Sequence, residues 1–231
     1  MSLLEEEPYI TFKPDYETGK KSGSSRREPP AMCPLKQAMQ GGTVIKEELP
    51  YEDGQTQGRL EGFCRTKLSY DRKCVKLQWE NDEKYQGLEK VLLDRASTCY
   101  ERVIGREYWL DAANRTDDNW EKFFHAMCVE LCNRQRNIRD VGYAHLAEAS
   151  HADGVDPFQE KERFEDVCRY LDMTPGDMPV PDLREKVRLY FSLYPKPWRT
   201  LFSNVPRDIA NPTETLDTVA KFMHKLHDGE Q

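Results

Sequence analysis

The sequence predicts an all-α protein, a multi-helix bundle of about six or seven helices that follows a disordered N-terminal tail. From about residue 80 onward, apolar side chains recur every three to four residues, as they do on the core-facing stripe of a helix. Capping residues precede several of these stretches, and Gly or Pro residues follow them. The predicted divisions are a tail over 1–58, a β-hairpin or irregular lead-in over 59–79, and a helical domain over 80–231.

The tail is rich in Gly, Ser, Pro, Lys and Glu, so it has too little apolar surface to offset the entropy of ordering. Its two apolar islands, at 9–12 and 32–39, are expected to dock on a partner or on the body of the protein. Two basic pairs predict a weak nuclear-import signal, and one lysine matches the pattern of SUMO attachment. These residues are Lys20, Lys21, Arg26 and Arg27 for import, and Lys46 for attachment.

The segment 59–79 shows alternation with a period of two. Leu60 and Cys64 alternate with polar neighbours, and Val75 and Trp79 do the same after a polar stretch. Such alternation on both sides of a polar turn indicates a hairpin, although the connection lacks the usual two-residue turn. An irregular lead-in remains the alternative.

The first predicted helix runs from Tyr85 to Val103 and stops at Gly105. The next opens at Asp118, where Glu121 follows three residues later and completes a capping box. Its apolar stripe consists of Trp120, Phe123, Phe124, Met127, Cys128 and Leu131.

Three later helices carry similar start signals, in which Asp156, Asp182 and Asn211 are the capping residues. Between the first two predicted helices and these three, the segment 138–151 is helix-like but weakly periodic. A short turn over 198–202 is expected after two prolines.

Composition permits a core and narrows the class of protein. The 231 residues are 38% hydrophobic, with eleven Tyr, nine Phe and four Trp, which is enough for a core of ~150 residues. No apolar stretch approaches the roughly 18 residues of a membrane helix, and the first residues are acidic where a signal peptide is basic. Seven cysteines, an odd number, are typical of reduced thiols. We therefore expect an intracellular protein, in the nucleus or the cytoplasm.

The net charge of −7 gives no general attraction to nucleic acid or to an anionic membrane. Binding of that kind needs a local basic patch, and the segment 133–139 supplies one with Arg134, Arg136 and Arg139. Further basic residues precede it, namely Arg65, Lys67, Arg72, Lys73 and Lys76. The alternative is a solvated helix end, where arginine is favoured by the helix dipole.

Motifs of catalysis are missing from the sequence. There is no Gly-rich phosphate loop, no His-Glu-x-x-His, no Gly-x-Ser-x-Gly and no Cys-x-x-Cys. The sequence therefore predicts no enzyme and no cofactor.

One group of residues has the spacing of a metal site. His125, Cys128 and Cys132 lie on neighbouring positions of one helix side, within reach of a common Zn²⁺. A fourth ligand would come from His145, His151 or Cys168. Burial of the cysteines as small core residues explains the pattern more simply, so no metal is predicted. His224 and His227 lie near a helix end, where the dipole favours basic groups without any ligand.

These observations favour a non-enzymatic adaptor or scaffold that binds a protein partner through its helices and its tail. The candidate contact residues are Trp109, Leu110, Tyr194, Trp198 and Phe222. The first alternative is a helical nucleic-acid-associated protein, such as a viral nucleoprotein or a capsid-like domain, that uses the three arginines named above. The second is a metal-dependent enzyme.

Overall fold

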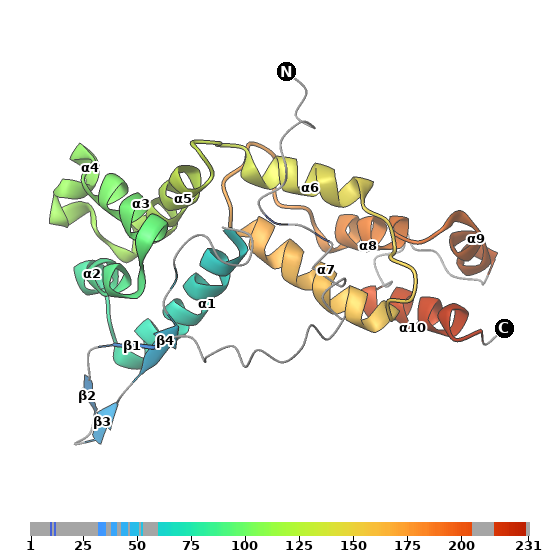
Figure 1. The fold of residues 1–231 in the computed structure, drawn as a ribbon, viewed down its shortest axis with the longest axis horizontal. Coiled ribbons are helices and arrows are strands. Elements are labelled where there is room, and N and C mark those ends of the chain that lie inside the picture. The colour runs from blue at the N-terminus through green and yellow to red at the C-terminus, as the bar shows by residue number, and fades with distance from the viewer. Residues whose placement is uncertain are drawn as a thin grey trace. The chain divides into compact units, whose positions relative to one another are not determined.

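A computed structural model gives the fold of the protein. It describes residues 60–204 and 215–229, and in the N-terminal part residues 10, 12, 32–35, 38–40, 43–45, 47–50 and 52. Within these ranges the chain is mostly helical, with ten α-helices and small antiparallel strand pairs near the N-terminus, so the predicted all-α class is confirmed (Figure 1).

The contacts within the chain form two compact units. The N-terminal unit contains the described residues from 32 to 138 together with 173–175, and the C-terminal unit contains residues 10 and 12 and the described residues from 139 onward, apart from 173–175. The sequence predicts one helical domain from residue 80 onward, and those domain boundaries stay a prediction.

Short strands and five helices make up the N-terminal unit, where α3 packs on α5 and α1 contacts β4. Strand β1 pairs with β4, and β2 pairs with β3, in both cases antiparallel. The elements in chain order are β1 (Met32–Pro34), β2 (Ala38–Gln40), β3 (Thr43–Ile45), β4 (Glu48–Pro50), α1 (Leu60–Leu77), α2 (Asn81–Val91), α3 (Asp94–Ile104), α4 (Glu107–Leu110), η2 (Ala112–Asn114), η3 (Asp117–Asn119) and α5 (Trp120–Leu131).

Five more helices belong to the C-terminal unit, where α10 lies beside α7 and also contacts α8 and α9 (Figure 1). The elements are α6 (Ile138–Glu148), α7 (Pro157–Asp172), α8 (Leu183–Ser192), α9 (Lys196–Asn204) and α10 (Leu216–His227). The N-terminal island predicted to dock on a partner or on the protein contributes Ile10 and Phe12, both buried. The ring of Phe12 meets Phe164 of α7 edge-on, with 6.4 Å between centroids.

The predicted hairpin or lead-in over 59–79 is wrong, because residues 60–77 form helix α1. Its buried positions include Leu60, Phe63, Tyr70 and Leu77, which follow helical and not alternating spacing. Lys67 lies on the same buried side of the helix. Because this charged residue interrupts the apolar stripe, the helical period is hard to recognise in the sequence. The antiparallel pairing occurs earlier in the chain, over 32–50.

The predicted single helix from Tyr85 to Val103 is two helices, α2 and α3, separated by an extended Leu92. The backbone of Glu52 causes the break by pairing with this part of the chain. Its N–H donates to the carbonyl of Val91 at 3.0 Å, and its carbonyl accepts from the N–H of Leu93 at 2.8 Å. Hydrogen bonds to a distant segment replace those of the helix, and periodicity within one segment cannot reveal them.

Two of the predicted caps form. Asp156 accepts from the N–H of Phe158 at 2.7 Å, and Asp182 makes a full capping box with Glu185. The capping box at Asp118 is wrong, because Asp118 lies in the 3₁₀ turn η3 and α5 begins after Asn119 without a side-chain cap.

At the end of the chain, the predicted cap Asn211 lies outside the described residues, and Thr215 caps α10 by accepting from the N–H of Thr218 at 3.2 Å. The expected short turn over 198–202 is part of a complete helix, α9.

Candidate functional site

Arginines gather on the N-terminal unit where α3 packs on α5. On α3, Arg95, Thr98, Cys99 and Arg102 are spaced at i, i+3, i+4 and i+7. This spacing places the four side chains along one side of the helix. Cys99 is buried at the edge of the core, whereas Thr98 and Arg102 are exposed. A line of polar and basic side chains therefore borders the contact between the two helices.

The turn that follows α5 adds a second group. Asn133 and Arg134 both have left-handed backbone conformations, with φ angles of 53° and 69°. The N–H of Arg134 donates to the carbonyl of Val129 at 2.7 Å and closes the turn. Helices often end with such a conformation, but glycine is the usual residue because any other side chain costs energy there. Asn133 and Arg134 both belong to the lining of the smaller pocket described next.

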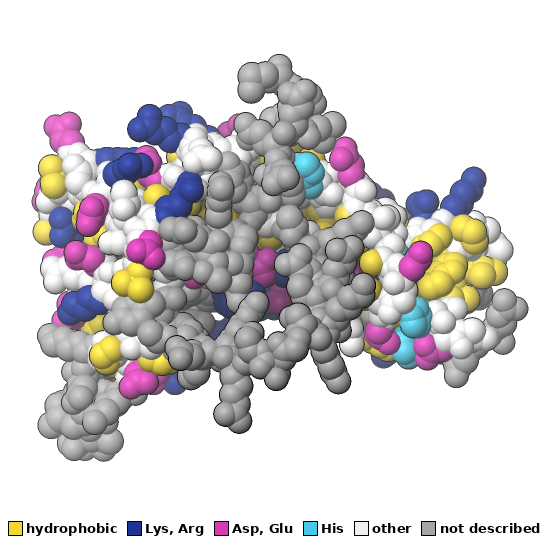
Figure 2. All heavy atoms as spheres, in the orientation of Figure 1, with side chains coloured by type: hydrophobic (Ala, Val, Ile, Leu, Met, Phe, Trp, Pro, Cys, Tyr) yellow, Lys and Arg dark blue, Asp and Glu magenta, His cyan; other side chains and the backbone are white. Residues whose placement is uncertain are grey.

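Together these segments line two adjoining pockets. The smaller pocket, of about 390 Å³, is lined by Arg95, Thr98, Cys99, Arg102, Glu130, Asn133 and Arg134. The larger pocket, of about 630 Å³, is lined by Arg106, His125, Ala126, Val129, Glu130, Arg134, Arg136 and Pro175. Glu130 and Arg134 belong to both pockets. We call the two pockets together the arginine surface, and Figure 2 shows Lys and Arg side chains gathered where α3 and α5 lie.

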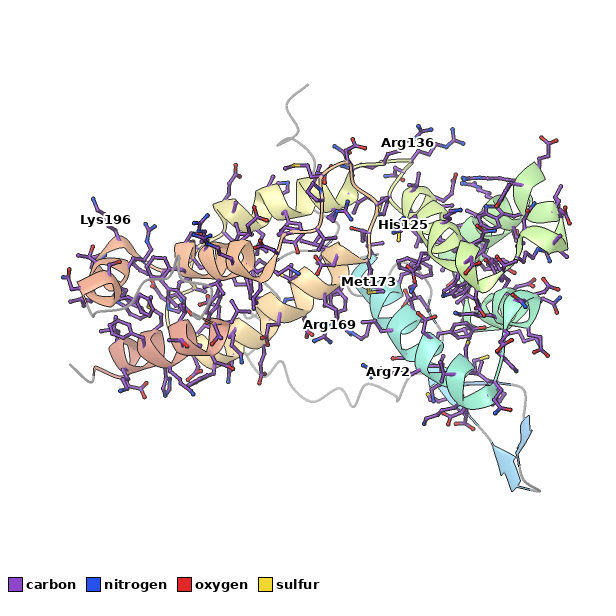
Figure 3. The ribbon with its side chains drawn as sticks, turned by 180° about the vertical axis from the view of Figure 1, so that it is seen from behind. Arg72, His125, Arg136, Arg169, Met173 and Lys196 are labelled. Atoms are coloured by element: carbon purple, nitrogen blue, oxygen red, sulfur yellow. The ribbon has the colours of Figure 1, made fainter. Side chains whose placement is uncertain are left out.

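The arginine surface carries an excess of positive charge, with five arginines around one glutamate. Arg106 pairs with Glu130, with 2.5 Å between Nη2 and Oε1. Three other arginines are exposed, and their side chains form no hydrogen bond or ion pair within the described part of the chain. These are Arg102, Arg134 and Arg136, of which Arg136 projects from the segment after α5 (Figure 3).

Arg95 has a fixed position in the smaller pocket. Its Nη2 donates to the carbonyl of Leu131 at 2.8 Å and to Oδ1 of Asn133 at 2.9 Å. The carbonyl of Leu131 lies at the C-terminal end of α5, where the helix dipole is negative. The positive charge of Arg95 therefore offsets the negative end of the helix dipole, which would otherwise repel an anion.

The arrangement is suited to holding an anion. Arginine carries a planar set of N–H donors that match carboxylate and phosphate oxygens. Burial raises the pKa of the Cys99 thiol despite the nearby Arg95 and Arg102, which disfavours its thiolate form. Recognition of negative charge is thus the chemistry that these side chains support.

Two of the three arginines predicted for nucleic-acid contact, Arg134 and Arg136, lie on this surface, and Arg139 does not. Arg139 belongs to the C-terminal unit, where it donates to the carbonyls of Gly176 at 2.9 Å and Met178 at 2.5 Å. The surface also contains Arg95, Arg102 and Arg106, which are not among the residues predicted from the sequence. The i, i+7 spacing of the first two was a usable signal, but their proximity to Arg134 depends on how α3 packs on α5.

Some of the basic residues that precede the segment 133–139 in the sequence form ion pairs with carboxylates. Lys67 Nζ lies 2.8 Å from both Asp71 and Glu121, and Lys73 Nζ lies 2.6 Å from Glu47. Their charges are compensated within the unit, so these lysines do not extend the arginine surface.

Residues predicted to contact a partner divide into buried and exposed ones. Trp109 is only 5% exposed and Tyr194 only 1%, so both are core residues that a partner cannot reach in this fold. Leu110 is 63% exposed. Trp198 is half-buried and stacks on Tyr194, and Phe222 is half-buried against Phe202. Partner binding by these last three residues stays a prediction.

The residues weighed as metal ligands are not gathered in one site. His125 is half-buried and lines the larger pocket (Figure 3), whereas Cys128 and Cys132 are fully buried. His151 pairs with Glu160, and His224 pairs with Asp156. Within the described ranges, no group of three His, Cys, Asp or Glu side chains is arranged to hold a metal ion.

The import residues Lys20, Lys21, Arg26 and Arg27, and the attachment residue Lys46, lie outside the described residues. Across the part of the chain that the structure describes, no helix combines the length and the apolar character needed to cross a bilayer. No protein-family model matches this chain, and neither a curated protein nor a solved structure matches it.

Proposed function

We propose that this protein is a non-enzymatic binding module that holds an acidic segment of a protein partner on its arginine surface. The observation that carries the proposal is the group of five arginines around a single glutamate on two joined pockets. Three of these arginines have no hydrogen bond or ion pair to any described side chain or carbonyl. The proposal thus assigns a specific surface to the adaptor function predicted from the sequence.

These arginines cluster in a chain whose net charge is −7. Like charges that are brought together destabilise the folded state, so such a group is maintained most readily when it serves recognition. A complementary negative segment would relieve the repulsion and would also be steered toward the surface. Recognition of acidic or phosphorylated motifs by arginine clusters is a common mode of peptide binding.

A protein partner fits this surface better than a nucleic acid does. No Phe, Tyr or Trp side chain lines either pocket, and His125, which lines the larger one, is half-buried. The net negative charge of the chain also repels a long polyanion. Helix α4 follows Arg106 directly and exposes Leu110, which supplies an apolar contact for a peptide, and Tyr108, whose ring can serve a peptide or a base.

The test measures the affinity of the full-length chain for a fluorescein-labelled peptide of alternating Glu and Ser, with a Gln and Ser peptide for comparison. Replacing Arg102 and Arg134 together with Gln should weaken binding of the acidic peptide by about tenfold or more, since each lost charge contact is worth on the order of 1 kcal/mol. The control replaces Arg184 and Arg188, two exposed arginines of α8, and should leave the affinity unchanged.

Salt and a competing polyanion complete the experiment. Binding of the acidic peptide should weaken as salt rises, because the contacts are between exposed charges. Failure to bind the acidic peptide at low salt would overturn the proposal. Tighter binding of single-stranded RNA of equal charge would instead support the nucleic-acid alternative.

A further inference from the structure

We infer that the smaller pocket binds a phosphate monoester, so that the acidic segment of the partner is a phosphorylated one. This inference rests on the proposed function and identifies the anion that the surface prefers. It depends on which groups line the smaller pocket, how they are held, and what backbone conformation presents them.

The number of donors in the smaller pocket exceeds what a carboxylate can use. Three guanidinium groups line it, from Arg95, Arg102 and Arg134, together with the amide of Asn133. The hydroxyl of Thr98 already donates to the carbonyl of Asp94, and the carboxylate of Glu130 in the pocket is paired with Arg106. A carboxylate has one charge and two oxygens, whereas a phosphate monoester has three terminal oxygens and a charge of about −1.5 to −2 at pH 7. A tetrahedral group with three acceptors therefore makes fuller use of donors that come from several directions.

The pocket is partly organised before any ligand binds. Arg95 is held by the carbonyl of Leu131 and by Oδ1 of Asn133. Because Oδ1 of Asn133 accepts from Arg95, the amide nitrogen of Asn133 keeps its own donors for a ligand. Arg95 likewise has N–H groups beyond the two contacts that hold it. Donors that are already fixed cost less entropy on binding, which favours tight recognition of a small group.

The backbone at the pocket supports the same reading. Asn133 and Arg134 have positive φ angles at a helix end where glycine would be free of strain. Strained conformations of this kind gather at ligand sites, where the strain positions a side chain. Here they bring an amide and a guanidinium to the same pocket as the basic side of α3.

A monoester also differs from the phosphates of a nucleic-acid chain. Each internal phosphate of RNA or DNA is a diester with one charge, and it lacks a third terminal oxygen. A phosphorylated side chain presents the full dianion on a short extension, which a pocket of about 390 Å³ can admit. Inorganic phosphate shares this chemistry, so the experiment has to distinguish the two sources.

The test uses the full-length chain and three peptides that share acidic flanks and differ only at a central residue, which is phosphoserine, Glu or Ser. Isothermal titration calorimetry at pH 7.5 should show the phosphoserine peptide binding about tenfold or more tightly than the Glu peptide, a difference of about 1.4 kcal/mol. At pH 5.5 the ratio should shrink, because the second ionisation of the phosphate has a pKa of about 6.

Two variants locate the preference. Arg102→Gln removes a donor of the smaller pocket alone and should reduce the phosphoserine-to-Glu affinity ratio to within about twofold. Arg136→Gln removes a residue of the larger pocket alone and should weaken both peptides while the ratio is kept. Circular dichroism checks that both variants keep the helical fold, which is expected because both side chains are exposed.

The outcomes separate the two proposals. Equal affinity for the phosphoserine and Glu peptides would overturn the phosphate inference and leave the proposed function standing, whereas binding of neither would overturn both. Millimolar inorganic phosphate should compete only weakly with the phosphopeptide. If inorganic phosphate competes as well as the phosphopeptide binds, or if single-stranded RNA binds more tightly, the inference of a phosphorylated protein segment is wrong.

Discussion

The C-terminal unit buries a histidine that is hydrogen-bonded to a glutamate, whereas the N-terminal unit keeps a group of arginines at its surface. His151 and Glu160 have side chains that are only 4% and 2% exposed, with 2.8 Å between Nδ1 and Oε2. Nearby, the hydroxyl of Tyr190 donates to the carbonyl of Pro157 at 2.7 Å and shares a hydrogen bond with Tyr194. Every member of this network has a partner within the fold.

The arginine surface shows the opposite use of charge, since three of its arginines have no partner among the described residues. Buried charges must be paired because desolvation of an unpaired charge is costly. Exposed charges carry no such requirement and remain available to a ligand. Lys67 of the N-terminal unit follows the same rule, because it is buried and paired with Asp71 and Glu121. The contrast therefore lies between buried, paired groups and the exposed arginine surface, and four predictions can break or sharpen it.

The largest effect is expected from Glu160→Ala in the C-terminal unit. The change leaves the buried ring of His151 without its hydrogen-bond partner, which costs about 1–3 kcal/mol, and the cavity left by the shortened side chain adds to this loss. Urea unfolding measures the loss, and Glu160→Gln, which keeps the shape and an acceptor, should lose less. The affinity for an acidic peptide should not change, because Glu160 is no part of the arginine surface. A loss of stability no greater than that of an exposed substitution would remove the contrast between buried, paired groups and the arginine surface.

A steric effect of intermediate size is expected from Gly87→Ala in the N-terminal unit. The added Cβ would lie 2.2 Å from Cζ3 of Trp79 and 2.4 Å from the hydroxyl oxygen of Tyr70. Overpacking of this kind costs about 1–3 kcal/mol. Thermal unfolding should show the loss, with Glu89→Ala, exposed on the same helix, as a near-neutral control. An unchanged melting temperature would mean that this core is less tightly packed than the structure indicates.

Alkaline pH should destabilise both units. Burial raises the pKa of the thiols of Cys74 and Cys168 to about 12, from an ordinary value of 9.0. A raised thiol pKa means that the folded state binds more protons, so its contribution to stability is complete below pH 9.0 and is lost as the pH rises toward 12. Each thiol contributes a slope of up to about 1.4 kcal/mol per pH unit. Cys168→Ala should reduce the slope measured by urea unfolding between those limits, and an unchanged slope would contradict the assignment.

The smallest effect is expected from Arg134→Gly, and its sign is the informative part. Glycine relieves the left-handed strain at this position, so the free energy of unfolding should rise by about 1 kcal/mol. The same change should weaken binding of the acidic peptide, because a guanidinium is lost from both pockets. Arg136→Ala, which relieves no left-handed strain, should leave stability within about 0.5 kcal/mol. A variant of lower stability would mean that the Arg134 side chain supports the fold.

Local signals were reliable where a short stretch of chain contains all the information. The cap at Asp156 and the capping box at Asp182 depend on side chains within three residues of the helix start, and both form. The prediction failed at Asp118 and at the break at Leu92, where a 3₁₀ turn or a distant strand-like segment replaced the local pattern. In α1, a buried Lys67 hid the helical period until its partners Asp71 and Glu121 were known.

The candidate site was only partly visible in the sequence. Arg134 and Arg136 stood out because they are neighbours in a basic run. Arg95 and Arg102 precede them by more than thirty residues, and nothing in a single sequence joins two such groups. Their convergence required α3 to pack on α5 and the turn after α5 to take its left-handed form.

The sequence by itself determined that this protein is helical, because apolar spacing and end caps act through bonds within one or two turns. Tertiary structure alone decided which charges are buried in pairs and which stay at the surface as one group. The physical reason is distance along the chain. Residues such as Arg95 and Arg134 are brought together by the burial of apolar side chains elsewhere in the fold, and that burial has no signature at the arginines themselves.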